Sequence, residues 1–64
     1  MKANFTDSEK ELLNGKIRAL SRKFGVSHTY VYMIMNGERE LTTPLATRIY
    51  NGLKETAEFF KPVA

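Results

Sequence analysis

The strongest constraint on the fold is a break of three residues between two short helical patterns. Ile17, Leu20 and Phe24 have the i, i+3 and i+7 spacing of one helix face. Gly25 follows at once, where glycine adopts a left-handed backbone without strain, and Ser27 is a good N-cap for a further helix. Because so few residues separate them, the two helices must cross at a steep angle and cannot form a long antiparallel hairpin.

Capping signals predict the ends of the first three helices. Thr6 and Glu9 form a capping box, which predicts a helix that runs to about Leu13. The second helix is expected over about 16–24. The third is expected from about 28 to 35 and ends at the turn residues Asn36 and Gly37.

A fourth helix is predicted behind a loop. Thr43 is its expected N-cap and Pro44 its first residue, since the missing N–H of proline does no harm there. Apolar spacing continues the helix to Phe60, with Pro62 closing it, unless Gly52 divides it into two. The expected buried positions are Leu12, Leu13, Ile17, Leu20, Phe24, Val31, Ile34, Met35, Leu45, Ile49, Leu53 and Ala57. Phe60 continues the last stripe, and its burial is left open.

No strand pattern competes with these helices, so the predicted fold class is all-α, with four to five helices. The chain has 64 residues, which is enough for one domain over 1–64 with frayed ends and no linker. It contains no cysteine, which excludes disulfides and thiolate metal sites, and its single histidine lacks partners for a zinc site. We expect no metal and no cofactor.

Neither a bilayer-spanning apolar run nor a signal-peptide pattern is present, so no membrane partner is expected. The expected location is cytoplasmic. An enzyme is excluded as a hypothesis, because the chain is too small to enclose a substrate. His28 also has no carboxylate or nucleophile at a useful spacing. No small-molecule substrate is expected.

The positive charge is concentrated in the centre of the chain. The net charge is +3, yet residues 15–37 contain four basic side chains and no acidic one. These residues are Lys16, Arg18, Arg22 and Lys23. Such a stretch suggests a polyanionic partner, although a merely solvated basic surface explains the charge equally well.

The third helix has an unusual outer face. With Val31 at the centre of its buried side, a rotation of about 100° per residue directs Thr29 and Met33 away from the core. Tyr32 and Asn36 lie on the same outer side. A plain solvated helix would carry Lys and Glu there, so this face favours contact with a partner.

This chain contains the arrangement Ile17-x2-Leu20-Ser21-x3-Gly25-Val26-x4-Val31-x2-Ile34. The arrangement resembles the helix-turn-helix motif of the phage repressor and Cro family. In that motif a small residue stands where the helices cross; here it is Ser21, where alanine is commoner. The resemblance covers residues 16–39. It implies a small lambda-repressor-like domain that is a sequence-specific DNA-binding transcriptional regulator, a Cro-like repressor from a phage, plasmid or bacterium, with helix 28–35 as its recognition helix. The implied location is the nucleoid of a prokaryotic or phage-infected cell.

The resemblance also implies roles for individual residues. The expected base contacts are His28, Thr29, Tyr32 and Met33. Their side chains can hydrogen-bond to base edges in the major groove or contact a thymine methyl group. The expected phosphate contacts are Lys16, Ile17, Ser27, Asn36, Gly37 and Arg39. Arg18, Arg22 and Lys23 are expected to attract the DNA backbone through their positive charge, even where they make no direct contact.

Several of these residues have a structural alternative. His28 can simply be solvated, Met33 can be covered by a dimer partner, and Arg39 can pair with a neighbouring glutamate. Tyr30 is as ready to pack on the scaffold as to touch DNA.

The expected partner is an operator in double-stranded DNA. A single module of this kind buries only about 600–1,000 Å², so a homodimer on a palindromic site is expected. Ala57, Phe59, Phe60 and Val63 are candidates for its surface, unless Phe60 closes the core of the monomer. A protein-interaction module, of antirepressor or antitoxin type, is the alternative function, and RNA binding is a weaker variant.

Overall fold

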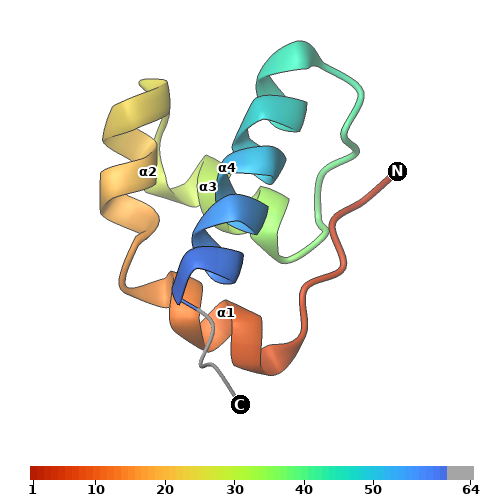
Figure 1. The fold of residues 1–64 in the computed structure, drawn as a ribbon. Helices are drawn as coiled ribbons and strands as arrows, with labels where there is room; N and C mark the ends of the chain where they lie inside the picture. The colour runs from red at the N-terminus through yellow and green to blue at the C-terminus, as the bar shows by residue number, and fades with distance from the viewer. Residues whose placement is uncertain (61–64) are drawn as a thin grey trace.

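Four helices make up the regular structure of residues 1–60, the part of the chain that the computed structural model describes (Figure 1). They are α1 (Asp7–Asn14), α2 (Ile17–Phe24), α3 (His28–Met35) and α4 (Pro44–Phe60). The described residues contain no strand. The all-helical fold class is therefore confirmed, with four helices.

The helix starts follow the predicted caps. The Thr6 hydroxyl accepts from the Glu9 N–H at 3.2 Å and the Glu9 carboxylate accepts from the Thr6 N–H at 2.9 Å, which completes the capping box. Ser27 accepts from the Tyr30 N–H at 3.2 Å, and Thr43 accepts from the Ala46 N–H at 3.1 Å. Each of α1, α3 and α4 thus begins at a side-chain cap.

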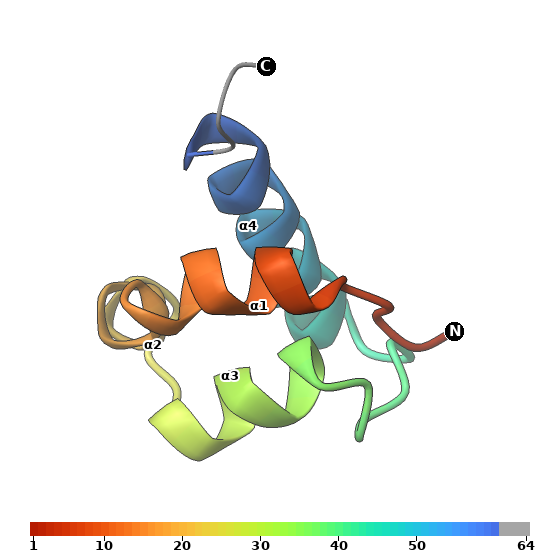
Figure 2. The ribbon, with the colours of Figure 1, turned by 90° about the horizontal axis from the view of Figure 1, so that it is seen from below.

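The long helix α4 packs against the three short ones and carries much of the core. Six large side chains are almost completely buried: Leu13, Ile17, Val31, Ile34, Ile49 and Leu53. Figure 2 shows α2 seen nearly along its axis while α3 runs across the view, which is the steep crossing expected from the short turn.

The buried face of α4 is rotated from the predicted one. Leu45 is 39% exposed and Phe60 is 44% exposed, whereas Ala46 is buried. The buried residues of α4 are Ala46, Ile49, Leu53 and Ala57. Leu45 lies at the edge of this buried face, and Phe60 lies beyond its last residue. Pro62, the expected end of this helix, lies outside the described residues.

Gly52 does not break α4. A Cβ atom at this position would lie 3.0 Å from the ring of Phe24, so the glycine makes room for that half-buried ring against α4.

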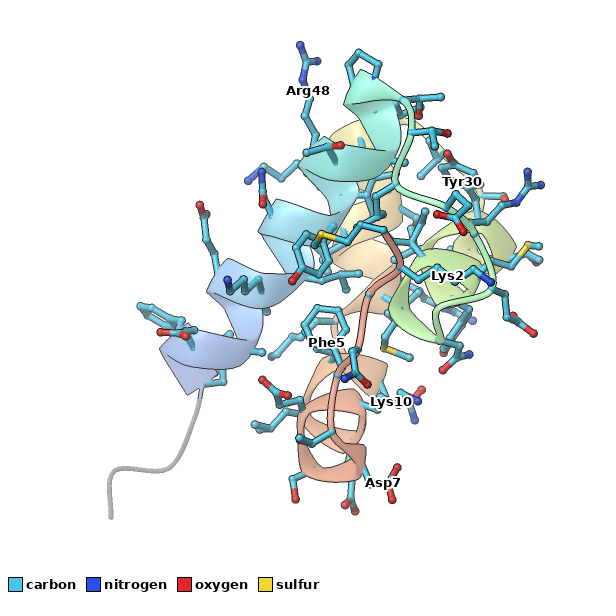
Figure 3. The ribbon with its side chains drawn as sticks, turned by 90° about the vertical axis from the view of Figure 1, so that its right-hand side faces the viewer. Lys2, Phe5, Asp7, Lys10, Tyr30 and Arg48 are labelled. Carbon is cyan, nitrogen blue, oxygen red and sulfur yellow. The ribbon has the colours of Figure 1, made fainter. Side chains whose placement is uncertain are left out.

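The first five residues are ordered, contrary to the expectation of a frayed N-terminus. Ala3 and Phe5 are buried, and the Phe5 ring centroid lies 5.7 Å from that of Tyr50. The Leu41 N–H donates to the Met1 carbonyl at 2.7 Å. Figure 3 shows this segment running between α4 and α3, with Phe5 on the side toward α4. Two apolar side chains and the loop before α4 hold it there.

Candidate nucleic-acid interface

The turn between α2 and α3 has the predicted left-handed glycine. Gly25 has φ 66° and ψ 37°, its N–H donates to the Arg22 carbonyl at 3.3 Å, and the Val26 N–H donates to the Ser21 carbonyl at 3.0 Å. Ser21, predicted as the small residue at the helix crossing, is buried, and its hydroxyl donates to the Arg18 carbonyl at 2.8 Å.

The predicted buried side of α3 is confirmed, but its outer face is narrower than predicted, because Tyr32 packs against the core and Met33 is half-buried. Val31, Ile34 and Met35 are buried. His28 and Thr29, in the first turn, are exposed, while Tyr32 and Met33 are half-buried. The four expected base-contact residues therefore retain accessible surface, and the two in the first turn have the most.

Tyr32 has a structural partner. Its hydroxyl donates to the Asn14 side-chain oxygen at 2.9 Å, and its ring packs against the core. The hydroxyl thus ties α3 to the end of α1. Its oxygen can still accept a hydrogen bond.

A hollow lies between the start of α2 and the start of α3. It is lined by Asn14, Gly15, Ile17, Arg18, His28 and Tyr32. Unlike the other three helices, α2 has no side-chain cap. The N–H groups of its first turn, at the positive end of the helix dipole, therefore have no capping side-chain oxygen, and two residues of that turn, Ile17 and Arg18, line the hollow.

Ile17 as a whole residue is 1% exposed, so its side chain cannot contact a partner, and the predicted contact at this position is limited to its backbone N–H. The adjacent Arg18 side chain is exposed and adds a guanidinium to the rim. An uncapped helix start beside an arginine is chemically suited to an anion such as phosphate.

Lys16 precedes this helix, but its groups are engaged elsewhere. Its backbone N–H donates to the Leu13 carbonyl at 2.8 Å. Its ammonium nitrogen lies 4.3 Å from the centroid of the Phe60 ring. Lys16 thus contacts the end of α4.

The loop after α3 contains three expected phosphate contacts. Asn36 is exposed, and Gly37 has φ 74°. The Arg39 guanidinium lies 5.7 Å from the centroid of the Tyr30 ring, at the side of α3. An aromatic partner of this kind orients the guanidinium and leaves its N–H groups free to donate.

Glu40, one alternative partner for Arg39, is paired with the N-terminal ammonium at 2.9 Å. That ammonium lowers the pKa of the Glu40 carboxyl. Tyr30, which was expected either to pack on the scaffold or to touch DNA, is half-buried and packs against the core. The Arg39 guanidinium lies over its ring.

The supporting basic residues Arg18, Arg22 and Lys23 are all exposed. Ser27 is exposed as well, so its hydroxyl caps α3 at a position open to a partner.

Lys2 is a candidate that the sequence reasoning missed. Its Cβ lies 4.0 Å from the point that a Cβ on Gly37 would occupy, so it stands beside the loop after α3. Figure 3 shows its side chain on the α3 side of the N-terminal segment. In the sequence, Lys2 comes just before the acidic first helix. Only the fold of residues 1–5 brings it beside the loop after α3.

In residues 1–60 there is no group of three or more His, Asp or Glu side chains placed to hold a metal ion. Within the same residues, none of the helices combines the length and apolar character that a bilayer span requires. A scan against protein-family models and searches of curated proteins and of solved structures gave no match to this chain.

Proposed function

We propose that this protein is a sequence-specific DNA-binding transcriptional regulator, a Cro-like repressor that inserts α3 into the major groove of an operator. The observation that carries the proposal is the pairing of two features at one face. The first turn of α3 presents His28 and Thr29 to solvent, and the uncapped start of α2 with Arg18 lies beside it. One feature suits base edges and the other suits a phosphate.

In the proposed complex, side chains of α3 read the bases. His28 donates to or accepts from a base edge, and Thr29 bonds a base or touches a thymine methyl. Met33 has an apolar edge for a thymine methyl or a sugar. Tyr32, whose hydroxyl donates to Asn14, contributes its ring and its remaining acceptor capacity.

Phosphates on the two sides of the groove position the protein. On one side, the amides of the first turn of α2, beginning at Ile17, receive a phosphate together with Arg18. On the other side, Asn36, Gly37 and Arg39 meet the backbone from the loop after α3. Ser27 lies between these two regions at the start of α3.

Two copies on a palindromic site complete the proposal, since one module buries too little surface for selective binding. The half-sites are then separated by about 34 Å or a multiple of it. The number of protein copies bound per selected duplex tests the proposed dimer separately from sequence-specific binding.

The test is selection of bound duplexes from a random library, followed by anisotropy titration of the selected site and of a random duplex. We expect binding to the selected site to be at least about 10³-fold tighter. Equal binding to both duplexes would reject sequence-specific repression.

The second candidate is a protein-interaction module, and Phe59 is the observation that favours it. Its side chain is 82% exposed, and its ring lies edge-on to that of Phe60 with centroids 5.0 Å apart. Salt dependence separates the two functions. Phosphate contacts give a steep negative slope of log affinity against log salt, whereas a protein partner held by these rings gives a nearly flat one.

A further inference from the structure

The end of α4 is joined to the start of α2 by a contact that the proposed function does not use. The Lys16 ammonium lies 4.3 Å from the centroid of the Phe60 ring, within the range of a cation–π interaction. The Phe60 ring also has an edge-on contact with the exposed Phe59 ring, with centroids 5.0 Å apart. Lys16 thus lies over the Phe60 ring alone, and Phe59 contacts only the edge of that ring.

This contact directs the ammonium away from the recognition helix. Figure 2 shows the C-terminal end of α4 and helix α3 at opposite ends of the molecule. Lys16 is the N-cap residue of α2, so its backbone is next to the uncapped amides that face the hollow. Without the ring, a flexible lysine at this position would reach a phosphate bound at those amides.

We propose that Phe60 is a positioning residue that withholds Lys16 from DNA phosphate. The inference rests on the proposed function. Its consequence is that phosphate binding at the start of α2 depends on backbone amides and Arg18. Because an amide must approach a phosphate closely and in line, the start of α2 then fixes the register of the protein more tightly than a long flexible lysine would.

The proposal is tested with Phe60→Leu on a random duplex. Releasing Lys16 adds one phosphate contact, so the slope of log affinity against log salt steepens by about 0.9. An attraction of the size found for exposed cation–π pairs corresponds to a gain of about two- to fivefold in affinity. Lys16→Gln in the Phe60→Leu background should remove both changes.

Phe59→Leu is the matched control. It removes a more exposed ring from the same helix turn and leaves the ring beneath Lys16 in place, so slope and affinity should stay at the wild-type values. NMR of the free protein reports the contact directly. The ε-methylene protons of Lys16 should show an upfield ring-current shift that Phe60→Leu abolishes and Phe59→Leu preserves.

A Phe60→Leu slope equal to that of Phe59→Leu overturns the inference. If Phe60→Leu does not fold, Lys16→Gln alone decides: we expect it to leave the slope unchanged while Arg18→Gln flattens it by about 0.9. Flattening by Lys16→Gln overturns the inference. A wild-type slope near zero rejects the proposed DNA binding itself, whereas a steep slope that Phe60→Leu does not alter rejects only the role of Phe60.

Discussion

At the residue scale, Gly25 and Gly37 adopt a left-handed backbone in different surroundings. Gly25 has φ 66° and open space where a Cβ would be. Gly37 has φ 74°, and a Cβ there would lie 2.8 Å from the Ala3 carbonyl oxygen. The first glycine is required by the turn alone, and the second also by the N-terminal segment that crosses it.

Alanine substitution should separate these two requirements. Gly25→Ala should destabilise the fold by about 1–2 kcal/mol, the strain of a left-handed residue with a Cβ. Gly37→Ala should lose at least about 1 kcal/mol more, because the clash with a backbone carbonyl adds an overpacking penalty. Urea unfolding of both variants measures the difference, and equal losses would contradict the close contact between Gly37 and Ala3.

Thr29→Ala tests the face of α3 that is proposed to contact DNA bases. Thr29 is exposed, so we expect the free energy of unfolding to change by no more than about 0.5 kcal/mol. Discrimination at one base pair of the selected site should fall by about 1–3 kcal/mol. Met33→Ala should show a similar loss of discrimination with more effect on stability, since Met33 is half-buried. A large loss of stability from Thr29→Ala would contradict the orientation of the helix.

Which residues could be predicted depends on how local their physics is. Gly25, Ser27 and the buried side of α3 follow from turn chemistry and the helical repeat within a few residues, and the structure confirms them. The apolar stripe predicts that Leu45 is buried, which is wrong, because the width of the buried face of α4 depends on what the other helices cover. The DNA contacts stay predictions.

At the scale of elements, a side-chain hydrogen bond between Tyr32 and Asn14 connects two helices. It joins α3 to the end of α1 at 2.9 Å. The sequence could not indicate this bond, since the two residues are 18 positions apart and each polar group could instead hydrogen-bond to water. Its position at the rim of the hollow makes it a support for the proposed phosphate site.

Tyr32→Phe should therefore lower the free energy of unfolding by about 0.5–1 kcal/mol, the net contribution of one hydrogen bond. Asn14→Ala should have little further effect in that background, since its partner is already gone. A double-mutant cycle by chemical denaturation gives the coupling. Fully additive losses would show that the bond contributes nothing to stability.

At the scale of the whole molecule, the fold brings positive charge from three separate segments to the region of α3. Arg18 comes from α2, Arg39 from the loop after α3, and Lys2 from the N-terminal segment. The basic stretch 15–37 predicts the first of these, whereas Lys2 lies outside that stretch, before the acidic residues Asp7, Glu9 and Glu11. Long-range packing of Ala3 and Phe5 produces the difference, and no local pattern encodes it.

Lys2→Gln tests this arrangement, with Lys54→Gln as the matched control. Both lysines are exposed, but Lys54 lies on α4 beside Glu55, Glu58 and Phe59. If Lys2 meets a phosphate next to the Gly37 loop, its loss should flatten the slope of log affinity against log salt by about 0.9 and weaken all sequences alike. Lys54→Gln should leave the slope unchanged. Equal slopes for the two variants would mean that the bound DNA does not extend to the N-terminal segment, and the proposed footprint would then end at Arg39.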